Sequence, residues 1–403
     1  VILYFIGLTE SYEGEGYDRK NLKIPQNQKE LLDEIAETVG KNHIAAISFG
    51  GAPMDFSFEK NVGAILHMYL GGQAVGESVA DLISGEVNPS GKLAETIPFS
   101  EKDTPAWRYF APPNDDVEYR ESIFVGYRYY ETFHVPVKYP FGYGLSYTSF
   151  SYSELNVPEV YSGGKIQIRF KIKNIGKVSG AEIAQLYICP NESDVIRSHI
   201  ELKGFQKIYL HPGEEKEVIL ELDERSFSVY DVEKKAFSML SGKYQICIGA
   251  SVHDLQLKAN MEVVGNSYFR NERELFPDYF REQPHGMEIS AEQFYQLLGG
   301  EPKHDKGKKR GEYTVYDSYQ DVVNVSMFGK FVRGVVHIGL KIILRGKSER
   351  DPAFKMVKMG VEEGNLEGLI ATSGGIATPK LIDMLVYNAN KKYLQAFKRL
   401  LKK

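Results

Sequence analysis

The first hundred residues alternate short apolar runs with amphipathic segments. Residues 1–8 and 44–49 are almost continuously apolar, and residues 28–39 between them place apolar side chains at helical spacing. A further apolar run, 62–69, precedes a second helical pattern at 75–83. Continuous buried strands separated by helices are typical of a parallel sheet covered by helices. The pattern therefore predicts an α/β sandwich domain with a mainly parallel sheet, which the chain enters partway, after its opening strands.

The pattern changes twice further along the chain. Residues 101–150 are rich in Pro and aromatic residues and show no alternation, which predicts a connecting segment. Period-two alternation with turn residues then predicts an all-β sandwich. Helical periodicity dominates after residue 324, and residues 381–401 are expected to form one amphipathic helix. The predicted domains are an α/β domain with its connecting segment at 1–150, a β-sandwich at 151–264 and a mostly helical C-terminal extension at 265–403.

Composition and charge restrict the classes of function. The chain has 403 residues, 42% of them hydrophobic and 26% charged, as in soluble globular proteins. A formal net charge of −5 gives no argument for nucleic-acid binding. No apolar run approaches the roughly 20 residues of a membrane span. The basic amphipathic C-terminus suits a solvated helix face or contact with an anionic membrane.

The cysteine and histidine content argues against a metal site. Cys189 and Cys247 lie in β-patterned segments, and no spacing typical of zinc ligands occurs. We therefore expect no metal and no cofactor. Two thiols suit a reducing compartment, although they could pair if their strands are neighbours. Since the first residues are strand-like and lack the basic start of a signal peptide, a cytoplasmic location is expected, apart from any signal in an upstream part.

The candidate chemistry lies in the loop that follows the first apolar run. Residues 9–19 read TESYEGEGYDR and hold four acidic residues, with glycines that allow sharp bends. The carboxyl end of a buried strand is where open α/β sheets usually bind ligands. A solvated acidic loop would have the same composition.

Ordered sequence blocks connect this loop to a known family. The loop, together with blocks at 64–93, 124–130 and 140–147, resembles the second domain of family 3 glycoside hydrolases, the β-glucosidase and β-xylosidase family. Three shorter blocks resemble the fibronectin-type-III-like domain that follows in that family; they lie at residues 185–187, 201–205 and 228–231. Residues 265–403 resemble, more weakly, a C-terminal extension of some bacterial members.

The resemblance implies a retaining mechanism with two carboxyl groups about 5–5.5 Å apart, a nucleophile and an acid/base. Glu13 matches the position of the acid/base, and Glu15 is the alternative because loop lengths vary here. The glutamate that is not the proton donor would be a structural carboxylate, pairing with Arg19. Asp18 and Arg19 are expected to hold the loop. In the family the nucleophile is an Asp on a TIM barrel, and nothing in this chain shows eight βα repeats. No nucleophile and no substrate-binding residue can be assigned.

We therefore expect part of an exo-acting, β-glucosidase-like enzyme that hydrolyses terminal non-reducing β-linked sugars. Its substrate would be a β-linked oligosaccharide or an aryl or alkyl glycoside. The barrel would lie on a second chain or an upstream segment, and the chain alone would be inactive. Homo-oligomers are compatible with the sequence. Two alternatives stay open: a non-catalytic carbohydrate-binding or assembly module that keeps the fold, and phosphorolysis in place of hydrolysis. Aromatic residues between 107 and 130 suit either sugar stacking or packing.

Overall fold

The computed structural model describes residues 1–14, 19, 21–110, 117–191, 193–265, 269–302, 308–347, 351–362 and 364–401. The chain divides into two compact units. One comprises Val1–Ile6 and Leu22–Pro302, and the other comprises Gly7–Asn21 and Lys303–Lys403. Glu15 and Asp18 lie outside the described residues.

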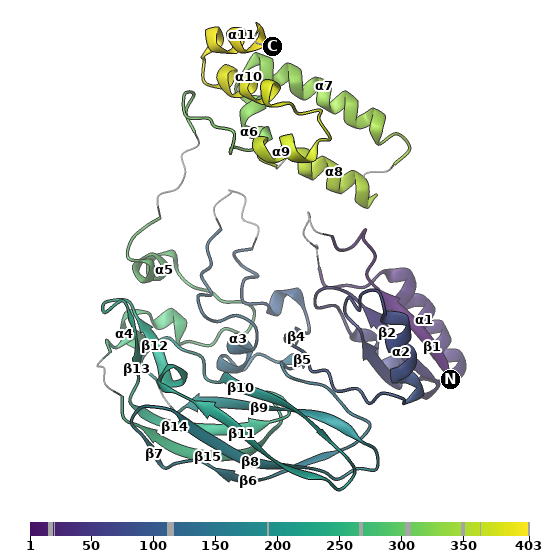
Figure 1. The fold of residues 1–403 in the computed structure, drawn as a ribbon, viewed down its shortest axis with the longest axis vertical. Coiled ribbons are helices and arrows are strands. Elements are labelled where there is room, and N and C mark those ends of the chain that lie inside the picture. Colours follow the sequence, from purple (N-terminus) through teal and green to yellow (C-terminus); the bar gives the residue numbers. More distant parts are fainter. Residues whose placement is uncertain are drawn as a thin grey trace. The chain divides into compact units, whose positions relative to one another are not determined.

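The first unit begins with a small α/β layer. Strands β1 (Ile2–Gly7), β2 (Ile44–Phe49) and β3 (Ala64–His67) form a sheet in that order, with β2 and β3 parallel. Helices α1 (Gln26–Val39) and α2 (Val75–Ser84) lie against it, as Figure 1 shows. Their apolar faces bury Leu32 and Val79. The predicted α/β domain is confirmed.

The connecting segment packs against residues that follow the sandwich. Strands β4 (Ile97–Pro98) and β5 (Val137–Tyr139) pair, and helix α3 spans Tyr127–Thr132. Helices α4 (Glu272–Leu275) and α5 (Ala291–Leu298) belong to the returning stretch. The two stretches share an aromatic core that includes Phe124, Tyr129, Tyr130, Phe276, Tyr279 and Phe294. The predicted extension thus divides in the structure, since residues 269–302 belong to the first unit.

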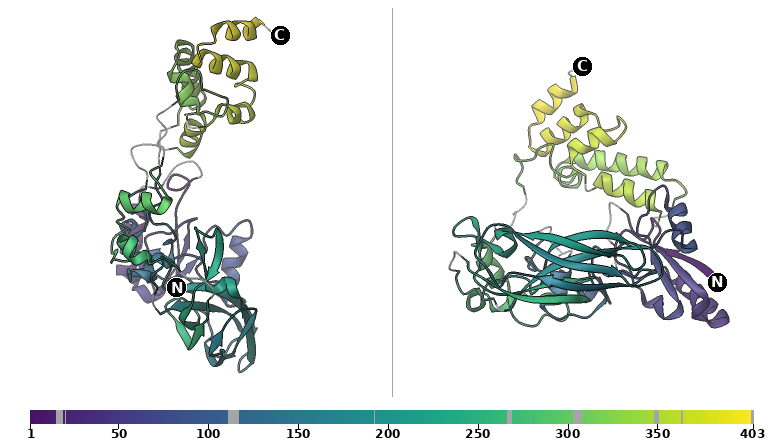
Figure 2. Two further views of the ribbon diagram at one scale, coloured as in Figure 1. Left: turned by 90° about the vertical axis from the view of Figure 1, so that its left-hand side faces the viewer. Right: turned by 60° about the horizontal axis from the view of Figure 1, so that its bottom comes forward.

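An all-β sandwich completes the first unit, as predicted. A five-stranded sheet has the order β10-β9-β14-β15-β7, and a three-stranded sheet has the order β11-β8-β6. The strands are β6 (Phe150–Asn156), β7 (Val160–Tyr161), β8 (Ile166–Asn174), β9 (Gly180–Pro190), β10 (Glu201–Leu210), β11 (Glu215–Leu222), β14 (Gly242–Gly249) and β15 (Leu255–Val263). A small separate ribbon pairs β12 (Ser228–Asp231) with β13 (Ala236–Met239). Figure 2 shows the strands from two further directions.

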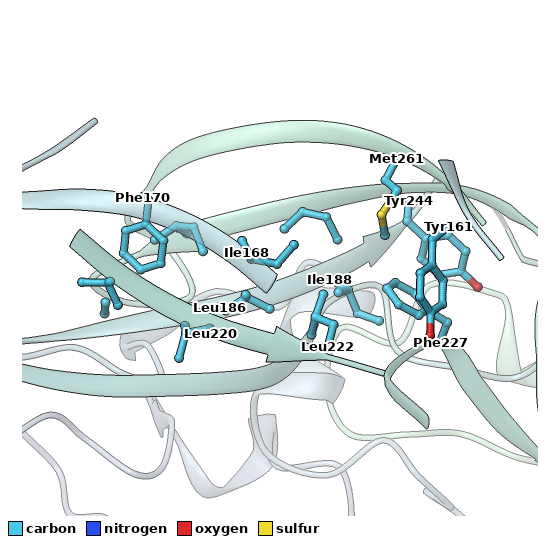
Figure 3. Packing of buried hydrophobic residues seen from close by; sticks show 14 of the residues in the cluster. Tyr161, Ile168, Phe170, Leu186, Ile188, Leu220, Leu222, Phe227, Tyr244 and Met261 are labelled. Carbon is cyan, nitrogen blue, oxygen red and sulfur yellow. The ribbon is translucent and has the colours of Figure 1, made fainter. Parts of the chain in front are cut away.

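The sandwich core follows from the period-two pattern. Ile168 and Phe170 of β8 and Leu220 of β11 point from one sheet toward Leu186 of β9 on the other (Figure 3). Aromatic rings close one end, where Tyr161 lies 4.9 Å from Phe227 between ring centroids. Because alternate residues of β8 and β11 face inward, the residues between them, such as Lys173 and Glu217, remain on the outer surface.

The second unit is helical beyond residue 308. Its helices are α6 (Tyr319–Asn324), α7 (Met327–Ile343), α8 (Pro352–Glu362), α9 (Leu366–Thr372), α10 (Pro379–Ala389) and α11 (Tyr393–Leu401). Side chains that accept backbone N–H bonds cap four of them; these are Ser318, Ser326, Asn365 and Thr378. Their buried core includes Val322, Val323, Val332, Leu366, Ile382 and Leu385.

One helix prediction was wrong. Residues 381–401 do not form a single helix, because α10 ends at Ala389 and α11 begins at Tyr393. Lys391 between them has φ of 60°, in the left-handed region, which interrupts the helix. Tyr393 is consequently exposed, although the single-helix pattern placed it with the buried Leu385. Among the described residues, none of the helices combines the length and apolar character that a membrane crossing requires.

Candidate active site

The loop that follows β1 is folded into a hydrogen-bonded turn. The carbonyl oxygen of Thr9 accepts the backbone N–H groups of Tyr12 at 2.8 Å and Glu13 at 3.2 Å. The hydroxyl oxygens of Thr9 and Ser11 are 2.7 Å apart. These contacts place Glu13 at the end of a closed turn, with its side chain partly buried. A catalytic carboxyl group requires a fixed position of this kind.

Arg19 is the charged neighbour of Glu13 in this loop. Burial lowers the pKa of the Arg19 guanidinium, and the negative charge of Glu13 opposes that shift. The two side chains therefore interact although six positions separate them. A pair with Arg19 is also the contact expected of a glutamate that is structural. Because Glu15 and Asp18 lie outside the described residues, the choice between Glu13 and Glu15 stays a hypothesis.

The sequence blocks at 64–93 and 140–147 meet in the first unit and form a joint. Asn88 Oδ1 accepts the hydroxyl of Ser146 at 3.0 Å and the N–H of Tyr147 at 2.9 Å. Its amide nitrogen donates to the carbonyl of Ser179 at 3.1 Å. The joint thus links the end of the α/β domain to the start of β9. These polar residues serve packing between domains, since each has a structural partner.

Lys92 and Gly144 complete the same joint. Lys92 Nζ lies 2.8 Å from the carbonyl oxygen of Gly144 and 3.0 Å from a carboxylate oxygen of the buried Glu182. A Cβ atom at Gly144 would lie 2.4 Å from the carbonyl oxygen of Gly91. The chain segments therefore approach too closely for any other residue there. These motif residues fix the domain arrangement within the first unit.

A second polar cluster, which the sequence analysis missed, lies at the carboxyl ends of β2 and β3. Ser48 Oγ is 2.9 Å from His67 Nδ1, and the ring of His67 lies 4.1 Å from that of Tyr69 between centroids. Tyr69 has φ of 51°, which is uncommon for a tyrosine. Burial raises the pKa of Tyr69 and of Glu95, and the charge of Glu95 raises that of Tyr69 further. In the sequence, the signal for this cluster was the polar residues at the end of each apolar run.

The aromatic residues between 107 and 130 divide into two groups. Phe124, Tyr129 and Tyr130 are buried, and the Tyr129 hydroxyl donates to the carbonyl oxygen of Gln283 at 2.6 Å. For these residues packing is the role that the structure supports. Trp107 and Tyr119 are exposed, and they keep a ring face that a sugar could use.

The described part of the chain holds no group of three or more His, Cys, Asp or Glu residues placed to bind a metal ion. Cys189 and Cys247 lie on the neighbouring strands β9 and β14 as free thiols, with their sulfur atoms 3.8 Å apart. The hydrogen bond with Cys247, together with burial, raises the pKa of the Cys189 thiol. The thiols pack as small buried side chains.

Comparisons with known proteins match this architecture. Residues 1–147 match the glycosyl hydrolase family 3 C-terminal domain, and residues 182–252 match the fibronectin type III-like domain. Thermostable β-glucosidase B of Acetivibrio thermocellus is 44% identical over 265 residues, which are 65% of this chain and 35% of that protein. An exo-α-(1→6)-L-arabinopyranosidase of Bifidobacterium breve is 37% identical over 266 residues, 66% of this chain and 35% of that protein.

Solved structures give the same result. The family 3 β-glucosidase of Bifidobacterium adolescentis superposes with a TM-score of 0.64 at 38% identity, covering 66% of this chain and 40% of that one. A β-glucosidase of Kluyveromyces marxianus, solved with glucose, has a TM-score of 0.61 at 36% identity and covers 65% and 32%. The chain spans about a third of the length of the curated relatives it matches.

Proposed function

Because this chain carries the C-terminal domain of family 3 glycoside hydrolases followed by their fibronectin type III-like domain, we propose that it supplies the acid/base glutamate of a retaining, exo-acting β-glycosidase. Glu13 is the proposed acid/base. The nucleophilic aspartate and most sugar-binding groups lie, in this proposal, on a TIM barrel outside the chain. The β-glucosidase relative supports a β-glucoside as substrate, and the exo-arabinopyranosidase relative supports action on a terminal sugar.

The proposed reaction has two steps. In the first, the protonated carboxyl group of Glu13 gives its proton to the glycosidic oxygen while the bond from that oxygen to the anomeric carbon breaks. The nucleophilic carboxylate bonds to the same carbon, and the alcohol leaves. In the second, water attacks that carbon, passes its proton to the Glu13 carboxylate, and releases the sugar from the nucleophile. Glu13 ends the cycle protonated.

The observation that carries the proposal is the position of Glu13. It ends a hydrogen-bonded turn directly after β1, inside the segment that matches the family domain. Arg19 also interacts with Glu13. A structural carboxylate would make the same contact, so the activity of Glu13→Gln decides between the two roles.

The test is carried out on the complete enzyme, containing the barrel on the same polypeptide or on its partner. We expect Glu13→Gln to lower kcat/KM for an alkyl β-glucoside by about 100- to 10,000-fold, the usual contribution of a general acid. Glu15→Gln is the matched control and should retain activity within a few-fold. If Glu15→Gln shows the large loss and Glu13→Gln does not, Glu15 is the proton donor.

The alternative is a non-catalytic carbohydrate-binding or assembly module. The exposed rings of Trp107 and Tyr119 are the observation that favours it, because aromatic faces bind sugars without chemistry. In that case the complete assembly keeps its hydrolytic rate with both glutamates changed to glutamine, while Trp107→Ala weakens sugar binding. Calorimetric titration with glucose and cellobiose measures that binding.

A further inference from the structure

The proposed acid/base loop belongs to the helical unit of the chain. The first compact unit stops at Ile6 and resumes at Leu22, and Gly7–Asn21 groups with Lys303–Lys403. The loop is therefore packed with residues from the far end of the sequence. The family models that match the chain end at residue 252, so this helical partner lies outside them.

A hydrogen bond ties the loop to the helices. Lys355 Nζ, on α8, donates a hydrogen bond of 3.2 Å to the carbonyl oxygen of Ser11. Ser11 lies inside the turn whose Thr9 carbonyl accepts the N–H of Glu13. Lys355 thus anchors the backbone of the turn at Ser11, two residues before Glu13. The contact is partly buried, and a charged donor makes such a bond stronger than a neutral one.

Helix α8 is itself fixed at both ends, so it can serve as an anchor. At its start, Asp351 accepts the N–H of Ala353 at 2.9 Å through its side chain and the N–H of Lys355 at 3.1 Å through its carbonyl. Near its end, Val361 packs against the buried core of the helical unit. After the helix, the carbonyl of Gly364 accepts the N–H of Tyr319 at 2.9 Å.

We propose that the helical unit positions the acid/base loop, and that Lys355 is the positioning residue. This inference rests on the proposed function. Lys355 holds the backbone from which Glu13 projects, and it has no part in bond breaking. Loss of the contact leaves the carboxyl group present but poorly placed. Proton donation therefore weakens, whereas attack by a nucleophile on another domain is unaffected.

Leaving groups of different acidity separate these two effects. The 2,4-dinitrophenolate of a 2,4-dinitrophenyl glycoside leaves without protonation, so kcat/KM for this substrate reports nucleophilic attack and sugar binding. An alkyl β-glucoside requires a proton from the acid/base, so its kcat/KM also reports the placement of that group. A general loss of folding or of sugar binding lowers both values equally, and a positioning defect lowers only the second.

The experiment compares Lys355→Met with Lys358→Met in the complete enzyme. Lys358 is on the same helix and exposed, so it is the matched control. We expect Lys355→Met to lower kcat/KM for the alkyl glucoside by about tenfold, the rate equivalent of one charge-assisted hydrogen bond, with 2,4-dinitrophenyl hydrolysis within about twofold. Lys355→Arg should restore most of the loss. Equal losses on both substrates, no loss on either, or the same loss in Lys358→Met would overturn the proposal.

Glu13→Gln in the same assay separates this proposal from the one on which it rests. If Glu13→Gln leaves the ratio of the two kcat/KM values unchanged, the assignment of the acid/base itself is wrong. If Glu13→Gln changes that ratio and Lys355→Met does not, only the positioning role fails.

Discussion

The β-sandwich and the helical unit bury their apolar side chains to different degrees. In the sandwich, both sheets turn alternate residues inward, and Ile246 on β14 is fully buried. In the helical unit, α7 buries Val332, whereas Phe331 and Ile338 on the same helix are 68% and 61% exposed. An apolar sequence therefore makes a closed core only where a second layer covers it. Burial of apolar side chains between its two sheets stabilises the sandwich. Helix α7 leaves more of the same residue types exposed and gains less stability from them.

One ionic network of the sandwich is partly buried. In it Glu201 Oε1 accepts from Arg197 at 2.7 Å and Glu201 Oε2 accepts from Lys203 at 2.5 Å. The pair of Arg399 with Asp383 in the helical unit, at 2.8 Å, is more exposed. Solvent therefore screens the second pair more than the first.

The largest expected effect is in the sandwich. Glu201→Gln leaves the Arg197 guanidinium, 3% exposed in its side chain, without a full counter-charge, and should lower the free energy of unfolding by about 3–5 kcal/mol. Glu221→Gln is the control, since its pair with Lys165 is exposed, and it should cost less than about 1 kcal/mol. Urea denaturation at neutral pH measures both. Equal values would contradict the difference drawn between buried and exposed pairs.

The same glutamate predicts how stability depends on pH. Burial raises the pKa of Glu201, but Arg197 and Lys203 outweigh it and hold the pKa below the ordinary value of 4.5. The folded state thus binds this proton less tightly than the unfolded state. The contribution of Glu201 to stability is present above pH 4.5 and is lost as the pH falls through its lower folded-state pKa. Below that range the stabilities of the wild type and Glu201→Gln should converge.

A matched pair of truncations tests the comparison of the two cores. Ile246→Ala in the sandwich should cost about 2–5 kcal/mol, because it removes buried methyl groups and leaves a cavity. Ile338→Ala on the exposed side of α7 should stay within about 0.5 kcal/mol. Each is measured on the unfolding transition of its own unit by calorimetry. A large cost for Ile338→Ala would mean that its side chain is covered in the protein in solution.

The sequence predicted elements with a strong period and missed contacts between distant segments. Residues 166–173 alternate clearly, and β8 is found at Ile166–Asn174. The break at Lys391 was missed because Asn390, the C-cap of α10, is a weaker helix-end signal than Gly or Pro. Glu13 was identified by the family resemblance. Its turn is held by local hydrogen bonds to the carbonyl oxygen of Thr9. The hydrogen bond from Lys355 to Ser11 joins residues 344 positions apart, so no local pattern could predict it.

The azide reaction of the Glu13→Ala enzyme tests the central claim most directly. This variant lacks the proposed acid/base, and the space left beside the glycosyl-enzyme admits a small anion that needs no base. With a 2,4-dinitrophenyl β-glucoside as substrate, the account predicts that sodium azide raises the rate and that NMR detects the β-glucosyl azide. Glu15→Ala should give glucose alone. Formation of the azide by Glu15→Ala, with none from Glu13→Ala, would contradict the account.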